Sequence, residues 1–404
     1  MLTMLPPARP ARQALLFAPA LFIAISSIAR STGEWNDFRG YIIAGEALRQ
    51  GLYSDHVSNT WPPFFSLFAA ALIELQRLPA PAARVLWGSF NAVIFGIACA
   101  RWFVASRSME APLWVAPAAA FAIAPFLALH LVTHQVYALV FAMAIELFIA
   151  AQRGDDAAAG VWLGVSASLK ITPLLTLPYF LLQRRWKLAA TACATAALCS
   201  LAVAPALGMR GDIDAHLRWI RRAASLRGTH GVRNQSIEAL VERLTTGEAK
   251  LEVSGIDPIV SLNQPTADRI GKVLSWLLVL GGAFALRRTR PIEAAPPLLA
   301  ISVLAVPYCW RTQLIALAPL LFVSFRRLRK PDLLDVLLLL PFFLAVVERE
   351  PGLIGLDNFL LLEGAGLTAA LALLLILDAL RLRHRETLRI SPEDSGGAIP
   401  ARTA

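Results

Sequence analysis

Two charged side chains sit beside or inside apolar stretches of this sequence, and they are the first candidates for chemistry. Asp37 belongs to a polar stretch, residues 33–63, that separates two strongly apolar segments. Lys170 interrupts another apolar stretch, residues 157–183. A charge in or next to a membrane segment usually binds a substrate, pairs with an opposite charge or reaches the headgroups. Asp37 could therefore be a catalytic carboxylate or a solvated loop charge, and Lys170 could bind a phosphate or pair with Glu146.

The polar stretch around Asp37 must form a loop at one membrane face, because its charges and irregular backbone would lack partners in hydrocarbon. Part of it has apolar residues at helical spacing, which predicts a short amphipathic helix lying in the interface. The sequence Trp61-Pro62-Pro63 ends this helix and opens the next apolar run. The apolar positions are Phe38, Tyr41, Ile42, Ala44, Gly45 and Leu48.

The composition predicts a protein with many membrane spans. Of the 404 residues, 57% are hydrophobic and 16% are charged, against about 25% charged in soluble domains. The formal net charge of +10 does not indicate nucleic-acid binding, because the basic residues cluster in short turns between apolar runs. The four cysteines form no CxxC or Cys/His ligand set, so neither a zinc site nor a disulfide framework is indicated. No nucleotide-binding glycine motif is present, which argues against chemistry driven directly by ATP.

We expect a single all-α membrane domain over residues 1–385, with about 11–13 transmembrane helices. A cytoplasmic tail, residues 386–404, is predicted to be disordered. Residues 157–183 differ from the other runs, because Lys170 and Pro173 divide them into two halves that are each too short to span. The other apolar runs are 13–30, 62–78, 84–104, 112–130, 135–151, 188–208, 271–286, 296–309, 311–325, 332–347 and 356–380.

The basic turns predict the orientation of the chain. Placing residues 184–187, 287–290 and 326–330 in the cytoplasm puts the loops 31–61 and 209–270 outside. That orientation requires an odd number of crossings between residues 62 and 183. One broken span over 157–183 gives five crossings and a hairpin gives six, so we expect the broken span. The arginines of the 209–270 loop indicate either an anionic partner or a helix that faces solvent or headgroups.

Several short motifs, taken in order along the chain, resemble the pattern of the family 87 glycosyltransferases, multi-span enzymes of the GT-C class. The resemblance covers roughly residues 30–325. Where the family often has histidines after the last motif, this chain has Arg311-Thr312-Gln313. The motifs are Asp37-x-x-x-Tyr41, Gly51-x-Tyr53, Trp61-Pro62-Pro63-Phe64, His134-Gln135-Val136-Tyr137, Leu169-Lys170-Ile171-Thr172-Pro173, Asn234-Gln235-Ser236-Ile237 with Arg243 downstream, and Pro307-Tyr308-Cys309-Trp310.

The resemblance implies that a sugar, most often mannose, is transferred from a polyprenyl phosphate to a glycan or glycolipid acceptor. Asp37 is the position matched to the general base, and transfer also needs cations that stabilise the departing phosphate. Lys170 and Arg311 are the candidate cations, although Arg311 could equally be an interfacial anchor. Glu34 is a second carboxylate on the same loop, which caps the helix or is solvated. The candidate substrate-binding residues are Glu34, Tyr41, Gln135, Lys170, Asn234, Gln235 and Arg311.

Two other functions are compatible with parts of the sequence. Glu74 and Glu146 lie inside apolar runs, as they would in a proton-coupled transporter or a lipid flippase. A membrane scaffold without catalytic activity is the third interpretation, which the ordered motifs disfavour. We therefore predict an inverting hexosyltransferase of the cell membrane with its active site on the extracytoplasmic face. Its partners would be the lipid-linked sugar, the acceptor and membrane lipids. The sequence contains no DxD loop motif, so it does not demand a metal or another cofactor.

Overall fold

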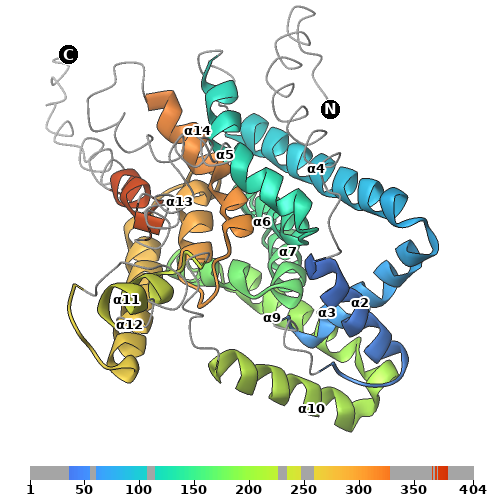
Figure 1. Ribbon diagram of the computed structural model, residues 1–404. Coiled ribbons are helices and arrows are strands. Elements are labelled where there is room, and N and C mark those ends of the chain that lie inside the picture. The colour runs from blue at the N-terminus through green and yellow to red at the C-terminus, as the bar shows by residue number, and fades with distance from the viewer. Residues whose placement is uncertain are drawn as a thin grey trace, which may run out of the picture.

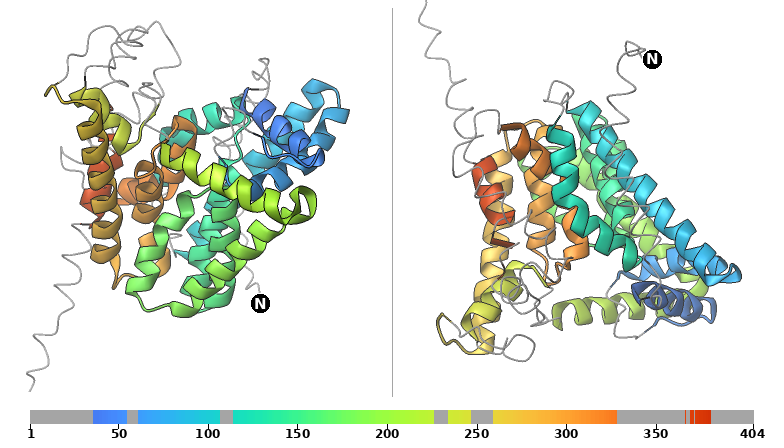
Figure 2. Two further views of the ribbon diagram at one scale, coloured as in Figure 1. Left: turned by 90° about the horizontal axis from the view of Figure 1, so that it is seen from below. Right: turned by 45° about the horizontal axis from the view of Figure 1, so that its top comes forward.

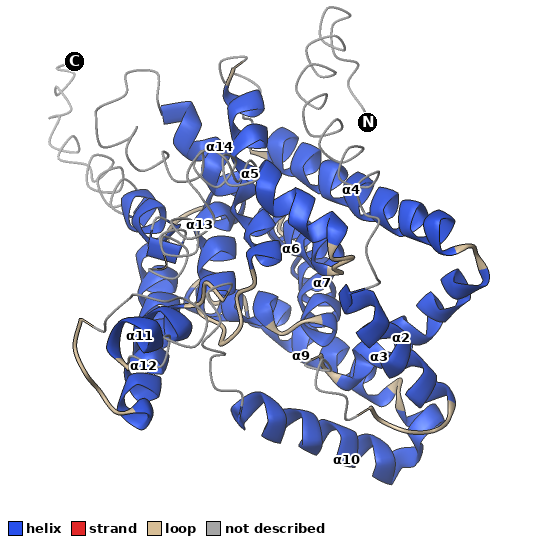
Figure 3. Cartoon of the chain, viewed as in Figure 1, coloured by secondary structure: helices blue, strands red, loops and turns tan. Residues whose placement is uncertain are grey.

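The computed structural model describes residues 36–54, 61–106, 114–225, 234–246, 259–327, 366, 369–370 and 372–380. Within these ranges the regular elements are helices, and the only β-type pairing is an isolated bridge between Asn234 and Trp310 (Figures 1 and 3). In chain order the elements are α2 (Asn36–Arg49), α3 (Pro63–Leu72), η1 (Ile73–Arg77), α4 (Ala80–Ala105), α5 (Val115–Val132), α6 (Tyr137–Gln152), α7 (Asp156–Leu169), η3 (Thr172–Thr176), α8 (Leu177–Leu182), α9 (Trp186–Leu201), α10 (Ala204–Ser225), α11 (Ile237–Thr245), α12 (Gln264–Leu286), α13 (Pro291–Leu304), η5 (Arg311–Leu317) and α14 (Ala318–Arg327).

The predicted fold class is confirmed: the described chain is an all-α membrane bundle. Three described helices are long and apolar enough to cross a bilayer, namely α4, α5 and α12. A fourth span is formed if α9 and α10 are counted together, although they meet at a bend of 107°. Helices α6 and α13 are apolar but shorter. The predicted runs 13–30 and 332–347 and the tail 386–404 lie outside the described residues, as does most of 356–380.

The amphipathic helix predicted in the first loop is present as α2. Its apolar residues Phe38, Tyr41 and Leu48 are buried. The Tyr41 ring contacts Trp61 and Phe65, which follow the Trp-Pro-Pro turn, with ring centroids 4.9 and 5.1 Å apart. Farther along, Gly45 lies against the Ala69 backbone and Arg49 donates to the Ala70 carbonyl, so α2 and α3 pack side by side and run parallel.

The bundle has two polar ends, which we name by their contents. The basic-turn face consists of the turns at residues 151–156, 183–186 and 287–291. The motif face consists of the turn 133–136, the break at 170–171, the turn 305–310 and Asn234. Antiparallel helices such as α5, α6, α7 and α13 run between these faces, as the views in Figure 2 show.

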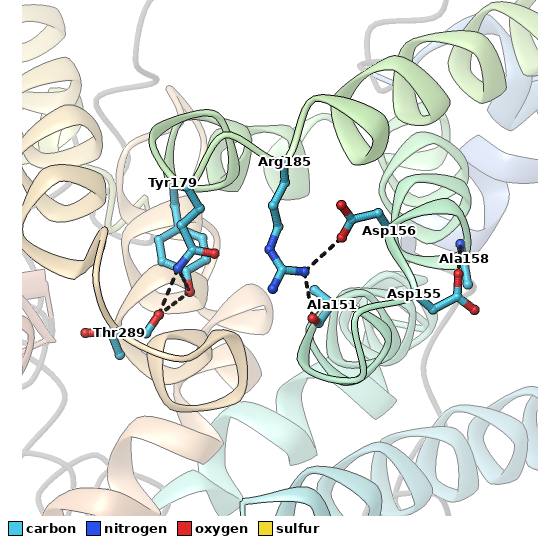
Figure 4. Close-up of polar contacts among 8 residues, drawn as sticks. Ala151, Asp155, Asp156, Ala158, Tyr179, Arg185 and Thr289 are labelled. Atoms are coloured by element: carbon cyan, nitrogen blue, oxygen red, sulfur yellow. Dashed lines mark hydrogen bonds and ion pairs between the residues drawn. The ribbon is translucent and has the colours of Figure 1, made fainter.

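Residues 157–183 form a hairpin, so the expectation of one broken span is wrong. Arg185, after α8, donates a hydrogen bond to the Asp156 carboxylate at the start of α7 (2.9 Å) and another to the Ala151 carbonyl (2.6 Å; Figure 4). Both ends of the segment therefore lie at the basic-turn face, with Lys170 at the far tip. The physical reason is the extended backbone of Lys170 (φ −156°), which ends α7 and lets the chain return through η3 and α8.

The hairpin packs tightly against α9 through two glycines. A Cβ on Gly160 would lie 2.6 Å from the Leu188 carbonyl oxygen, and one on Gly164 would lie 2.6 Å from Cβ of Thr195. Only glycine permits this distance, which is the small-xxx-small mode of helix packing in membranes. The first arm of the hairpin is thus fixed to α9 along its length.

Residues 62–78 do not cross the bundle, in contrast to the expectation from their hydropathy. α3 has only 10 residues, about 15 Å of helix, whereas the hydrocarbon core is about 30 Å thick. Phe38 at the start of α2 and Trp87 in the first turns of α4 both contact His134, so the chain from 38 to 87 begins and ends at the motif face. The described chain to residue 183 then passes between the faces through α4, α5, α6 and the two arms of the hairpin. These are five passes, again an odd number. The first loop and the basic turn at 184–187 therefore still lie at opposite ends of the bundle, as the orientation prediction requires.

Candidate functional site

The turn between α5 and α6, residues 133–136, is held from two other helices. The indole Nε1 of Trp87 donates a hydrogen bond to the His134 carbonyl (3.0 Å), and the Tyr41 hydroxyl accepts one from the Val136 amide (3.2 Å). His134 adopts a left-handed conformation with φ of 58°, which is strained for a side chain other than glycine and persists only where the surroundings enforce it. Burial, with Arg84 nearby, lowers the pKa of His134 to about 4, so the imidazole is neutral at neutral pH.

Helix α2 brings the candidate base to this turn. Asp37 lies in the first turn of α2, and the next residue, Phe38, packs against Trp87 and His134 with ring centroids 5.7 and 6.5 Å apart. The Asp37 side chain and the whole of Glu34 lie outside what the structure describes. The placement of α2 therefore supports a site at the motif face, while the role of Asp37 stays a prediction.

Lys170 points toward the start of α6. Its ammonium lies 5.4 Å from the centroid of the Tyr137 ring, within range of a cation–π interaction. Tyr137 also faces the side chain of Thr172. The pairing considered for Lys170 and Glu146 is not found, because Glu146 lies more than two turns along α6 from Tyr137 and its carboxylate accepts hydrogen bonds from Arg101.

Asn234 fastens the turn at residues 305–310 to the start of α11. Its side-chain oxygen accepts hydrogen bonds from the amides of Cys309 (2.9 Å) and Ser236 (3.1 Å), and its nitrogen donates to the Pro307 carbonyl (2.8 Å). The fully buried Arg243 donates to the Asn234 carbonyl (2.6 Å). The amide side chain of Asn234 is therefore engaged with the backbone of this chain.

Gln235 is engaged in a similar way. Its backbone amide donates to the Cys309 carbonyl (2.7 Å), and its side-chain oxygen accepts from the Ala369 amide (3.3 Å). Both residues of this motif thus connect separate segments of the chain. Gln135 is also brought to the motif face and is buried in the turn after α5.

Arg311 and His130 complete a buried polar cluster next to Lys170. Arg311, 9% exposed, lies over the ring of Phe126 at 5.9 Å, and Phe126 is one helical turn before His130 in α5. The His130 ring lies beside the Thr312 backbone and within electrostatic reach of Lys170. We call His130, Tyr137, Lys170, Arg311 and Thr312 the cationic cluster.

Several polar atoms of this region have no hydrogen-bond partner at good geometry among the described residues. They are both ring nitrogens of His130, the Thr312 hydroxyl and the Gln313 side-chain oxygen. A buried polar atom without a partner costs about 1–3 kcal/mol. Their concentration beside two cations is what a binding site for a polar, anionic ligand requires.

The sequence motifs indicate most of the polar residues at the motif face but do not include two of them. The structure brings Tyr41, Gln135, Lys170, Asn234, Gln235 and Arg311 to the motif face, while their roles toward a substrate stay predictions. It adds His130 and Thr312. The available signal for His130 was a titratable residue within an apolar run, which is rare in membrane helices and usually functional.

The two carboxylates that suggested transport are both paired with arginines. Glu74 accepts a hydrogen bond from Arg49 at 2.6 Å and lies 2.9 Å from Arg77. The hydrogen bond from Arg49 lowers the pKa of Glu74, which is half exposed in a segment that does not span. Glu146 pairs with Arg101. Neither carboxylate is therefore an unpaired acidic group inside the bundle, which is the feature that suggested transport.

Fold and site together define a polytopic all-helical membrane protein with a cationic polar cluster at one end of the bundle. Residues 59–309 match the model of glycosyltransferase family 87. The match covers more than half of the chain and includes Gln135, Lys170, Asn234 and Gln235. The chain belongs to glycosyltransferase family 87. No curated protein and no solved structure matches it in the corresponding comparisons.

Proposed function

We propose that the protein transfers a hexose, mannose in the first instance, from a polyprenyl phosphate to a glycan or glycolipid acceptor. The observation that carries this proposal is the cationic cluster. Lys170 and Arg311 lie on separate elements at the motif face, next to buried polar groups that have no well-aligned partner in the part of the chain that the structure describes. A polyprenyl-phosphate sugar has one anionic group at headgroup height and a lipid in the bilayer, which matches a cation site at the end of a membrane bundle.

The proposed reaction is a direct displacement at the anomeric carbon of the donor sugar. Asp37 accepts the proton of the acceptor hydroxyl while the hydroxyl oxygen of the acceptor forms the new bond to the anomeric carbon. The bond from that carbon to the phosphate oxygen breaks on the opposite face, so the configuration inverts. Lys170 and Arg311 stabilise the negative charge that the departing phosphate gains, and His130 and Thr312 supply hydrogen bonds to it.

The remaining motif residues have positioning roles in this proposal. Asn234 and Gln235 hold the turn that precedes Arg311, since their amides are already bonded to backbone groups. Tyr41 holds α2 against the turn 133–136 through its hydroxyl. Gln135, buried in that turn, is the candidate for a hydrogen bond to the sugar.

The proposed active site faces the extracytoplasmic side of the cell membrane. The support is the position of the short basic turns at the other end of the bundle, because Arg184, Arg185 and Lys187 lie with Arg287 and Arg288 at the basic-turn face. Short positively charged turns remain in the cytoplasm. The proposed mechanism assigns no step to a metal. Among the described residues, no three His, Cys, Asp or Glu side chains form a group that could hold one.

The test is transfer by the purified protein in lipid nanodiscs. Polyprenyl-phosphate mannose and polyprenyl-phosphate glucose, each labelled in the sugar, are offered with candidate glycolipid acceptors. We expect the label to move to an acceptor and free polyprenyl phosphate to appear in equal amount. Direct use of a nucleotide sugar would refute the lipid donor. Movement of the intact lipid-linked sugar across a vesicle membrane, without transfer to an acceptor, would establish a flippase instead.

A further inference from the structure

Helix α10 runs across the bundle instead of along it. It meets α9 at 107° and lies crosswise at the bottom of Figure 1, next to α2 and α3. The guanidinium of Arg218 lies 5.7 Å from the Tyr53 ring after α2. Asp212 and Ala215 are buried toward the protein. The two long polar segments of the sequence therefore meet at the motif face, where α10 has the direction of a helix parallel to a membrane surface.

A continuous apolar stripe on α10 is exposed. Met209, Ile213, Leu217 and Ile220 follow one another at intervals of four, four and three residues, and thus lie on one face of the helix. Their exposed fractions are 57%, 54%, 45% and 53%. A stripe of this length is unfavourable in water and marks a contact with another molecule or a membrane.

Two exposed arginines border the stripe. At 100° per residue, Arg210 and Arg221 lie on the same side of the helix, 20–40° beyond Leu217 at the edge of the stripe. Their side chains are long enough to place the guanidinium at a lipid phosphate while the stem covers apolar surface. A helix with an apolar face, a cationic border and a direction perpendicular to the spans fits an anionic lipid surface better than a neutral protein.

We propose that α10 lies in the headgroup layer of the bilayer and binds anionic lipid, with the stripe at the acyl boundary and Arg210 and Arg221 at lipid phosphates. This contact holds the motif face at a constant height above the hydrocarbon. It depends on the geometry of α10 and not on the reaction assigned to the cationic cluster.

The depth of the stripe is measured with a bimane label in a variant whose four cysteines are replaced by alanine. The label is placed at Ile213 on the stripe or at Asp214, which is also exposed but lies about 60° beyond Leu217 on the side of the two arginines and is a matched control on the same helix. We expect spin-labelled lipids to quench bimane at Ile213 and to leave bimane at Asp214 accessible to an aqueous quencher. Equal lipid quenching at both positions, or shielding of Ile213 from both quenchers by a protein partner, would overturn the proposal.

The lipid preference is measured on the protein with its own cysteines, so the second test does not depend on the labelled variant. Thermal stability is compared in nanodiscs of phosphatidylcholine with and without phosphatidylglycerol. Phosphatidylglycerol should stabilise the unaltered protein, and Arg210→Gln with Arg221→Gln should remove that effect. The affinity of the double variant for anionic lipid should fall about 25-fold, about fivefold for each arginine, so that less of this lipid co-purifies. Arg269→Gln, an exposed arginine at the start of α12, is the control. Equal responses of the double variant and this control would refute the role of the two arginines.

Discussion

The two ends of the bundle differ in how some of their buried polar groups are paired. At the basic-turn face, Tyr179 and Gln183 both donate hydrogen bonds to the Thr289 carbonyl (2.8 and 2.9 Å), and Arg185 bonds to Asp156 (Figure 4). At the motif face, His130 and the Thr312 hydroxyl are buried without a well-aligned partner among the described residues. The turns of the basic-turn face and the turns of the motif face thus have different roles. The pairs at the basic-turn face stabilise the bundle. In the proposed function, His130 and Thr312 at the motif face keep their hydrogen-bonding capacity for the ligand.

The largest effect is expected at Asp37. Asp37→Asn keeps the shape of the side chain but cannot accept a proton, so sugar transfer should fall about 100-fold or more. Binding of the lipid-linked sugar should persist, because the proposed phosphate contacts lie on other elements. The measurements are single-turnover transfer and donor binding.

Two carboxylates serve as references for Asp37. Glu46→Gln, exposed on the same helix, should transfer at a normal rate. Glu34→Gln should lose far less activity than Asp37→Asn. Normal transfer by Asp37→Asn together with an inactive Glu34→Gln would assign the base to Glu34.

Lys170 tests whether the motif face binds an anion. Lys170→Met removes the charge beside Tyr137 and should lower kcat/KM for the lipid donor by about 30-fold, while Lys170→Arg should recover part of it. Lys187→Met, at the basic-turn face, should leave the kinetics unchanged. A loss of folding in Lys170→Met with normal donor use by the folded fraction would make Lys170 a structural residue.

Arg185 tests the opposite end. Arg185→Gln breaks the contact that closes the hairpin and should lower the free energy of unfolding by about 2 kcal/mol. The activity per folded molecule should stay within twofold, since the cationic cluster lies at the far tip of the hairpin. A thermal denaturation midpoint and an activity assay on the same sample give both values. A tenfold loss of specific activity at unchanged stability would contradict the division between the two faces.

The smallest effect is a pH dependence from Glu238 in α11. Burial raises the pKa of Glu238 to about 7, with Lys272 opposing and Asp268 adding to the shift. A carboxyl whose pKa is higher in the folded state stabilises the fold fully below about pH 4.5, and this contribution is lost as the pH rises through 7. Stability should therefore fall by about 1 kcal/mol between pH 5 and 8, a value reduced for partial solvent access.

The matched pair of variants for this prediction is Glu238→Gln and Glu46→Gln. Thermal denaturation across that pH range should show a flatter profile for Glu238→Gln than for the unaltered protein. Glu46→Gln, an exposed glutamate on α2, should keep the original profile. An unchanged profile in Glu238→Gln would assign the pH dependence to other groups.

The sequence predicted the elements of the site better than the path of the chain. Helical spacing is local, so the amphipathic α2 and the break at Lys170 were both found. The hairpin was not, because it depends on Arg185 meeting Asp156, a contact between residues 29 apart that hydropathy does not register. His130 was missed for the same reason, because it is distant in sequence from Lys170 and Thr312 and lies beside them only in the folded protein.

Gly160 and Gly164 have a consequence for how the protein is made. Each arm of the α7–α8 hairpin is too short and, at Lys170, too polar to remain alone in lipid, yet α9 is synthesised only after the hairpin is complete. We expect the hairpin to remain bound to the insertion machinery until α9 has been synthesised and packs against the two glycines. Substitution of either glycine by leucine should therefore reduce the yield of inserted protein and increase its degradation during synthesis.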